Sequence, residues 1–426
     1  MSAKIISLFL YLFLFIFVTP VTDARPLFSP NSGETKVSIG ERINILLERM
    51  SPEEKIGQLF MVAGDGNLGE LIHSYHLGGV VLFSRHTETI EQTLQMTQKI
   101  RRSSLIQPLI AIDQEGGRIS RLSFATPVPS ARALGHLDET ALLLIGWIVG
   151  QELHELGFNL NFAPVLDVDT CDENPVIGSR SFSSDPHIVA TLGTAYLRGL
   201  RSAGVAGTVK HFPGHGDTST DSHLTLPVVN QSRDRLNSVE LLPFTAATRS
   251  GAEVVMMAHV HYPALDPTKN LPASLSGPII TGILRKEMNY DGIIITDAMN
   301  MKAITDFTNS GQAALMAFQA GNDIILMPEN LQEAYFSLLL AVRNGTITET
   351  RLNESVRRIL RLKLTLPADT ETPFDLLLSR ANSSIGSHEH RLGLDSLMKG
   401  KLSPVESPTQ ARSKKGLFPD TESGIP

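Results

Sequence analysis

The sequence predicts an α/β protein, a (β/α)8 TIM barrel that forms a single domain over residues 41–366. Three observations support this prediction. Short apolar runs recur along the stretch, each run is followed by a polar or glycine-bearing turn, and each turn leads into a segment with helical periodicity. Alternating strands and helices form a parallel sheet, and eight such units fit a closed barrel. A doubly wound open sheet is the alternative, but no glycine-rich dinucleotide-binding turn is found in the sequence.

The eight apolar runs are expected to be the strands, because strands buried on both faces read as continuous runs of Val, Ile and Leu. They cover residues 58–63, 79–83, 108–112, 159–168, 207–212, 254–260, 292–296 and 323–327. Helical periodicity is found at residues 88–102, 138–156, 186–203, 233–250, 276–288, 312–320 and 331–343. TIM barrels carry their active sites in the loops that follow the strands. The polar residues just past each apolar run are therefore the candidates for chemistry.

The N-terminal residues 1–24 have the pattern of a signal peptide. Lys4 precedes an unbroken apolar run over residues 5–18, and Pro20 follows shortly after the end of this run. Small residues before Arg25 favour cleavage after Ala24. The run is short for a membrane span and suits a signal-peptide core, so a periplasmic or secreted protein is expected. An uncleaved membrane anchor is the alternative, and membrane association is expected only in that case.

Residues 367–426 differ in composition from the rest of the chain. They are rich in Ser, Pro, Thr, Lys and Glu, and their apolar periodicity is weak. Such composition is typical of a low-complexity, disordered tail. The prediction leaves room for one short helix over residues 375–380 and assigns the tail no function.

Charge and cysteine content narrow the function classes. The net charge is −7, and no basic stripe interleaved with aromatic residues is found, which argues against a nucleic-acid partner. The single cysteine, Cys171, excludes an internal disulfide and a CxxC metal cluster.

One polar stretch concentrates titratable groups. It runs from Lys210 to His223 and reads KHFPGHGDTSTDSH. Glycine, proline, serine and threonine favour turns, so a long loop is expected directly after the fifth strand. Gly214 and Gly216 are predicted to let this loop move. His215 and Asp217 are interpreted as residues that structure the loop.

Further candidates follow the other strands and converge on the same rim of the barrel. They are Asp113, Glu115, Arg118 and Arg121 after the third strand, Asp167 and Arg180 after the fourth, His259 and His261 after the sixth, and Asp297 after the seventh. For Asp113 and Asp297, capping of a following helix is the alternative role. For the three arginines, the alternative is an ordinary position on the protein surface, where most arginines lie.

Glycoside hydrolysis suits this set of residues, since it needs a carboxylate on one face of a sugar and a proton donor on the other. Asp297, at the end of a rigid strand, suits the nucleophile. Asp221 can hydrogen-bond His223, which titrates near neutrality and can give and take a proton in successive steps. The remaining polar residues form a hydrogen-bonding ring suited to sugar hydroxyls. They are Asp113, Arg121, Arg180, Lys210 and His211.

Two alternatives belong to other classes. A metal-dependent hydrolase would assemble its ligands from His211, His215, Asp221, His259 and His261. Against it, no ligand spacing matches a known site, and Lys210 with several arginines would crowd a cation. A non-catalytic sugar-binding protein would be expected to have lost Asp297 or the Asp221–His223 pair, and all three residues are present.

The chain resembles glycoside hydrolase family 3, in its bacterial single-domain β-N-acetylglucosaminidase branch. The matching motifs appear in family order from about residue 47 to residue 364, and the KHFPGHG…DSH loop is the most specific of them. The others are IDQEGGRISR at 112–121, FAPVLD at 162–167, IGSRSF at 177–182, MAH at 257–259, ASLS at 273–276 and ITD at 295–297.

The resemblance implies a role for each matching residue. Asp297 is implied as the nucleophile, and Asp221 with His223 as the acid/base dyad. Asp113, Arg121, Arg180, Lys210 and His211 are implied as the residues that hold the terminal N-acetylglucosamine. The implied activity is retaining removal of β-linked N-acetylglucosamine from the non-reducing end, with peptidoglycan fragments as the expected substrate.

The resemblance implies no metal and no organic cofactor, and a monomer is expected. The β-glucosidase branch of the family takes its acid/base carboxylate from a second domain. No such domain is recognised in this sequence, which favours the histidine mechanism. The chain departs from the family pattern directly after the nucleophile, where Ala298 and Met299 replace the usual Asp or Ser and then Leu.

Overall fold

The computed structural model describes residues 37–222, 225–367 and 371–400. The predicted signal peptide, His223 of the predicted dyad and residues 401–426 lie outside this part of the chain. Within it, no helix is long and apolar enough to cross a membrane.

Eight parallel strands form the centre of the fold, as predicted. They are β1 Phe60–Ala63, β2 Gly79–Leu82, β3 Leu109–Ile112, β4 Leu160–Asn161, β5 Ala206–Phe212, β6 Val254–Met257, β7 Ile293–Thr296 and β8 Ile325–Leu326. Neighbours pair in the order β7-β6-β5-β4-β3-β2-β1-β8. A parallel bridge between Ile295 and Ile324 brings β7 beside β8, and the amide of Thr296 donates to Ile324 O at 3.1 Å. These contacts close the sheet into a TIM barrel.

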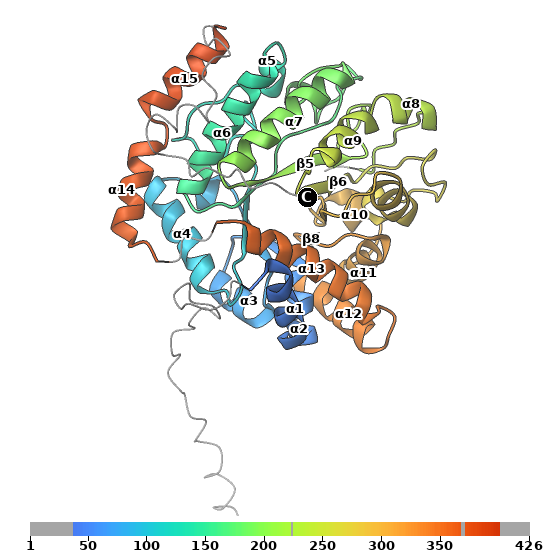
Figure 1. Ribbon diagram of the computed structural model, residues 1–426. Coiled ribbons are helices and arrows are strands. Elements are labelled where there is room, and N and C mark those ends of the chain that lie inside the picture. Colours follow the sequence, from blue (N-terminus) through green and yellow to red (C-terminus); the bar gives the residue numbers. More distant parts are fainter. Residues whose placement is uncertain (1–36, 223–224, 368–370, 401–426) are drawn as a thin grey trace, which may run out of the picture. The chain divides into compact units, whose positions relative to one another are not determined.

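Helices surround the strands (Figure 1). Those before and within the first half of the barrel are α1 Ile39–Arg49, α2 Pro52–Gln58, α3 Leu68–Tyr75, α4 Ile90–Arg102, α5 Ala131–Leu134, α6 Glu139–Glu155 and α7 Pro186–Ser202. Those that follow are α8 Arg233–Ser238, α9 Leu241–Arg249, α10 Lys302–Thr305, α11 Ser310–Ala320, α12 Leu331–Arg343, α13 Glu349–Thr365, α14 Phe374–Ser384 and α15 His388–Met398. Short 3₁₀ turns are η1 Ser84–His86, η2 Gly178–Arg180 and η3 Ala273–Leu275, and η4 Pro278–Glu287 is a π-helix.

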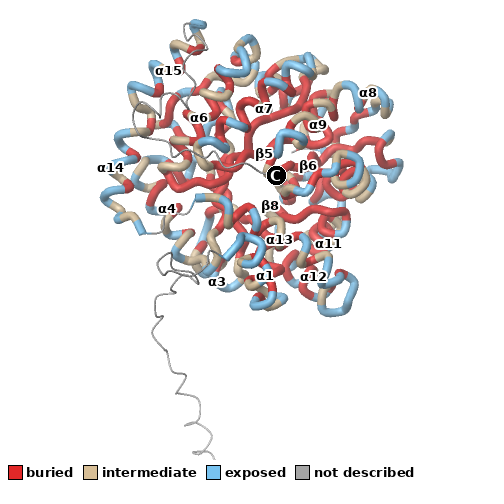
Figure 2. Tube along the Cα trace, viewed as in Figure 1, coloured by how far each residue is buried: buried red, intermediate tan, exposed pale blue. Residues whose placement is uncertain are grey.

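The strands are buried and the outer faces of the helices are exposed (Figure 2). Residues of β2, β3, β5, β6 and β7 are buried along their whole length. This burial on both faces explains why the strands read as apolar runs rather than as alternating patterns. Helix starts follow ordinary capping: Asp138 accepts from the amide of Ala141 at 2.8 Å, and Asp185 accepts from that of His187 at 2.8 Å.

Two of the predicted elements differ from the structure in ways that prolines explain. The helix expected over 233–250 is divided into α8 and α9, which begins at Leu241. Pro243 lies in the first turn of α9, where the missing amide hydrogen does no harm, so a new helix starts there. The strand expected over 159–168 ends at Asn161. Pro164 follows shortly after and cannot donate to a strand ladder.

The predicted disordered tail is wrong for residues 374–398. This segment forms α14 and α15, and it buries Leu377, Ala381, Leu394 and Leu397. The helix allowed over 375–380 lies inside the longer α14. Apolar residues recur here at helical spacing, but the many serines and charged residues between them hide the pattern in the composition. The helix pair packs on the barrel: α14 contacts α4 and α6, and α15 contacts α6.

Candidate active site

The candidate residues converge at the carboxyl ends of the strands, as the barrel topology requires. Asp113 directly follows β3, Lys210 and His211 lie near the carboxyl end of β5, and Asp297 directly follows β7. Helix capping does not explain either aspartate. The next helix after Asp113 begins at Ala131, and the next after Asp297 begins at Lys302.

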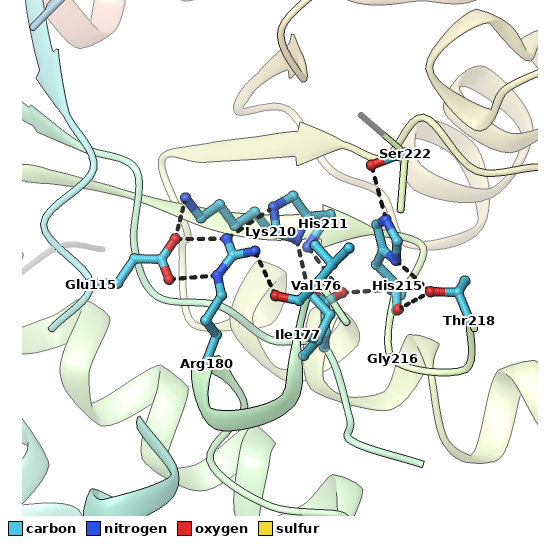
Figure 3. A network of polar contacts seen from close by, with 12 residues as sticks. Glu115, Val176, Ile177, Arg180, Lys210, His211, His215, Gly216, Thr218 and Ser222 are labelled. Atoms are coloured by element: carbon cyan, nitrogen blue, oxygen red, sulfur yellow. Dashed lines mark hydrogen bonds and ion pairs between the residues drawn. The ribbon is translucent and has the colours of Figure 1, made fainter. Parts of the chain in front are cut away.

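Lys210 and Arg180 are held by one buried carboxylate, that of Glu115. Lys210 Nζ lies 2.7 Å from Glu115 Oε1 and 2.8 Å from Asp113 Oδ1. Arg180 donates two bonds of 2.8 Å to the two oxygens of Glu115. Figure 3 shows both cations pointing at this carboxylate. Burial acts to raise the pKa of Glu115, but Lys210 and Arg180 hold it far below its usual range. The carboxylate is therefore ionised.

Glu115 was not among the residues predicted to hold a sugar. The sequence did contain a signal for this residue, because Glu115 lies two residues after Asp113 in the same motif. Only the structure shows that it joins the third, fourth and fifth strand loops. Arg121 is more open: its Nη2 lies 3.6 Å from Asp113 Oδ2, and its Nε is buried without a hydrogen-bond partner among the described residues. Arg121 thus keeps one donor that no described group accepts.

His211 is oriented by Asp167, another carboxylate that sequence reasoning did not assign. Asp167 Oδ2 lies 2.6 Å from His211 Nδ1, and Oδ1 accepts the amides of His211 at 3.1 Å and His215 at 2.6 Å. Burial acts to raise the pKa of Asp167, and the histidines lower it below its usual value. The carboxylate places a proton on Nδ1, and Nε2 then faces Arg180 Nη2 at 3.5 Å.

Asp297 is fixed by backbone contacts at the end of β7. Its amide donates to Met257 O at 3.0 Å, and its Oδ1 accepts from the Ala298 amide at 2.7 Å. Burial acts to raise the pKa of this carboxyl, but His211, His259 and the Ala298 amide hold it below its usual value. Asp297 is therefore an ionised carboxylate in a confined position, which is what a nucleophile requires.

His259 contacts the backbone of the residue that follows Asp297. Its Nε2 donates to Ala298 O at 3.1 Å, and its Nδ1 accepts from Ser274 Oγ at 2.7 Å. Burial lowers the pKa of His259, although the charge of Asp297 acts in the opposite direction. His261 Nδ1 lies 3.2 Å from Leu271 O on a different side of the strand end. Within the described residues, no group of three His, Cys, Asp or Glu side chains is arranged to hold a metal ion.

The base of the strand-5 loop is tightly packed. A Cβ on Gly216 would lie 1.7 Å from Val168 O, and Gly214 has a φ of 135° beside Glu240. The side-chain amide of Asn174 donates to the carbonyls of His215 and Gly216, each at 2.9 Å. The two glycines thus serve close packing here, whereas the sequence interpretation gave them the role of freeing the loop.

His215 structures the loop, as predicted. Its Nδ1 lies 2.9 Å from Thr218 Oγ1 and its Nε2 3.3 Å from Ser222 Oγ, so the ring joins the base of the loop to the residue beside Asp221 (Figure 3). Burial lowers the pKa of His215 to about 4, which keeps the ring neutral. Asp217 accepts from Gln231 Nε2 at 2.6 Å and is structural as well.

Met299 is one of the two residues that depart from the family pattern. It is buried and lines a cavity of about 310 Å³ together with Ile304, Ile325 and Pro328. The substitution therefore affects packing between the loops after β7 and β8. Ala298 contributes its backbone, which donates to Asp297 and accepts from His259, so the small side chain leaves these contacts unchanged.

Comparison with known protein families shows to which family the chain belongs. Residues 51–362 match the family described as "Glycosyl hydrolase family 3 N terminal domain". The chain belongs to glycosyl hydrolase family 3. This match covers the whole barrel and every strand-end residue described above, so the resemblance drawn from the motifs is confirmed.

Family 3 relatives are similar over most of this chain. Beta-hexosaminidase A of Pseudoalteromonas piscicida is 36% identical over 354 residues, which cover 76% of this chain and 58% of the relative. The beta-hexosaminidase of Hydrogenovibrio crunogenus is 38% identical over 259 residues, 59% of this chain and 71% of the relative. This chain thus spans less than two thirds of the first relative.

Solved family 3 structures share the fold. A glycoside hydrolase family 3 beta-N-acetylglucosaminidase from Paenibacillus sp. str. FPU-7 is 39% identical with a TM-score of 0.73, over 79% of this chain and 69% of that structure. A beta-glucoside phosphorylase is 28% identical with a TM-score of 0.77, over 84% of this chain and 66% of that structure.

Proposed function

We propose that this protein is a retaining, exo-acting β-N-acetylglucosaminidase. It removes β-linked N-acetylglucosamine from the non-reducing end of a glycan. The observation that carries the proposal is the ionised Asp297 at the end of β7, next to a ring of ordered polar residues at the ends of β3 and β5. The names of the beta-hexosaminidase relatives agree with it.

The proposed reaction has two steps. In the first, Asp297 Oδ2 attacks the anomeric carbon, a C–O bond to the enzyme forms, and the glycosidic C–O bond breaks as His223 protonates the leaving oxygen. In the second, His223 removes a proton from water, whose oxygen attacks the same carbon and releases Asp297. Asp221 orients the imidazole and stabilises its charged form. Two inversions return the original configuration.

The five residues predicted to hold the sugar are proposed to have two different roles. Asp113, Arg121, Lys210 and His211 are proposed to contact sugar hydroxyls. Lys210 has three N–H donors and gives two of them to carboxylates, which leaves one for a hydroxyl. Arg180 is held by both oxygens of Glu115, so its main role is to place that carboxylate and, through it, Lys210.

Substrate source and location are part of the proposal. The predicted leader supports a periplasmic or secreted enzyme, and peptidoglycan fragments are the proposed substrate because they present β-linked N-acetylglucosamine there. An N-terminal anchor would place the same enzyme on a membrane. A monomer is also part of the proposal.

The test is hydrolysis of para-nitrophenyl β-N-acetylglucosaminide by the protein without residues 1–24. We expect turnover that is lost in Asp297→Ala, and the matched control Asp306→Ala, at an exposed position directly after α10, should keep it. Turnover that survives Asp297→Ala would contradict the assignment of Asp297 as the nucleophile. Loss of activity with a chelator and recovery with zinc would favour the metal alternative. A product that becomes a sugar phosphate when phosphate is added would indicate phosphorolysis, the activity named for one structural neighbour.

A further inference from the structure

The C-terminal helix pair, α14 and α15, follows the part of the chain that matches the family, which ends at residue 362. The pair packs against α4 and α6 on the outside of the barrel (Figure 1). Its connecting residues 385–387 also approach the strand-3 loop, defined here as residues 113–130 between β3 and α5. That loop carries Asp113, Glu115 and Arg121.

Glu152 of α6 is the point where the helix pair and the strand-3 loop meet. Its Oε1 accepts from the Gly386 amide at 2.9 Å and lies 2.8 Å from His390 Nδ1. From the loop side, Thr126 donates its amide to Oε2 at 2.9 Å and its hydroxyl to Oε1 at 2.6 Å. Glu152 is 3% exposed, so these donors replace water entirely. Burial acts to raise the pKa of Glu152, and the His390 and Thr126 contacts hold it below its usual value.

A second contact joins the two segments directly. Gly386 has a φ of 58°, and a Cβ on it would lie 2.5 Å from Phe124 O in the strand-3 loop. Backbone therefore packs on backbone at this point, without room for a side chain. The helix pair and the strand-3 loop are therefore joined here by a close backbone contact, and not by side chains alone.

The contact continues from Thr126 to the carboxylate that holds Lys210 and Arg180. The amide of Val128 donates to Thr126 O at 2.9 Å, and Val128 O accepts from the Gly117 amide at 2.9 Å. A Cβ on Gly116 would lie 2.6 Å from Pro129 O. The turn that follows Glu115 is thus seated on residues 126–129. Holding Thr126 in place is therefore expected to hold the backbone from which the Glu115 side chain extends.

We propose that residues 386–390 are a brace that positions the strand-3 loop for sugar binding, acting through Glu152 and Thr126. His390 and Thr126 are positioning residues and touch no substrate. The proposal rests on the proposed function for what the loop binds, and the position of the loop is measurable without a substrate. It assigns a role to a segment that lies outside the family match.

The test compares two full-length variants that both loosen the helix pair. His390→Ala removes one of the donors to Glu152. Arg380→Ala removes the 3.0 Å ion pair with Glu155, which ties α14 to α6 without involving Glu152. We expect His390→Ala to raise KM about fivefold to tenfold, the loss of part of one charge-assisted hydrogen bond, with kcat changed less than twofold. His390→Asn, whose side-chain amide nitrogen takes the place of Nδ1, should restore most of the affinity. Arg380→Ala should leave KM unchanged.

Hydrogen exchange gives the second readout. Amides of residues 116–128 should exchange faster in His390→Ala and in Thr126→Val, which removes the hydroxyl at constant volume, and not in Arg380→Ala. Equal effects of His390→Ala and Arg380→Ala would mean that the helix pair only adds general stability, and the brace would be wrong. Unchanged exchange in both Glu152-directed variants would also overturn it. If the wild-type protein hydrolyses no glucosaminide, the proposed function fails, while the exchange comparison still decides the brace.

Discussion

Glu115 Oε1 lies 2.7 Å from Lys210 Nζ, and both side chains are nearly inaccessible to solvent, at 7% and 3% exposure. The same carboxylate accepts both bonds of Arg180. One acid therefore sets the positions of two cations from different strand loops. A buried charge that loses its partner is costly, whereas a neutral isostere keeps the shape of the side chain. This relationship makes Glu115 the residue to test first.

Glu115→Gln is expected to lower kcat/KM at least a hundredfold, because Lys210 and Arg180 would then repel each other across a neutral amide. The variant should also lose about 3 kcal/mol of stability, as when one partner of a buried pair is removed. Steady-state kinetics and chemical denaturation give the two values. Glu139→Gln, which breaks the exposed pair with Arg198, is the matched control and should change neither. Wild-type kinetics in Glu115→Gln would show that the cations hold their positions without it.

The pH dependence of Asp297 follows from its surroundings. His211 is the largest of the influences that lower its pKa against the opposing effect of burial. A nucleophile must be ionised, so a lowered pKa extends activity to more acidic pH. His211→Asn removes this influence and should raise the pKa of Asp297, so the acid limb of the kcat profile moves to higher pH. The profile between pH 3 and pH 7 measures it, and an acid limb that stays in place or moves lower contradicts the expectation.

The barrel and the positions of its strand-end residues were predictable because burial and topology act through the local sequence. Doubly buried strands need continuous apolar runs, and parallel pairing brings their carboxyl ends to one rim. Asp113, Lys210, His211 and Asp297 lie at strand ends for that reason.

Glu115 and Asp167 were not assigned because their value depends on partners far away in the sequence. Arg180 is 65 residues from Glu115, and His211 is 44 residues from Asp167. No local pattern fixes such distances. The helix pair was missed for another reason. Its buried residues, such as Leu377 and Leu394, stand among polar residues, so the average composition resembles a solvated tail although the helical spacing is present.

Lys363 gives a prediction about stability and pH. Its side chain is fully buried in α13, and its Nζ donates to Gln58 Oε1 at 2.7 Å. Burial lowers its pKa to about 7. The unfolded chain keeps the ordinary lysine pKa of about 10.4 and binds more protons than the folded chain between these two values. Stability therefore rises with pH across that window, and below pH 7 the cost of the buried charge is present in full.

Lys363→Met should flatten this rise, which amounts to about 4 kcal/mol for a difference of about three pKa units. Urea denaturation at pH 6, 8 and 10 measures it. Lys399→Met, at an exposed position on the last described turn, is the control and should leave the pH dependence unchanged. A rise in Lys363→Met equal to that of the wild type would assign the pH dependence to other groups.

Ser222 gives the sharpest prediction about the proposed proton donor. It stands between Asp221 and His223 in the sequence, and its Oγ lies 3.3 Å from Nε2 of His215. The Asp167 carboxylate anchors His215 by accepting its amide at 2.6 Å, so the base of the loop is fixed. Among the described residues, Ser222 is one contact that joins the dyad segment to this base. Ser222→Ala should lower kcat about tenfold, the loss of one hydrogen bond, with little change in KM because no sugar contact is removed.

A leaving group such as 2,4-dinitrophenol needs no protonation, so with that substrate the variant should form the glycosyl-enzyme intermediate at the wild-type rate. Ser219→Ala, an exposed position in the same loop, is the control. If Ser222→Ala slows both substrates equally, the contact supports the nucleophile side of the site, and its proposed link to proton transfer is wrong.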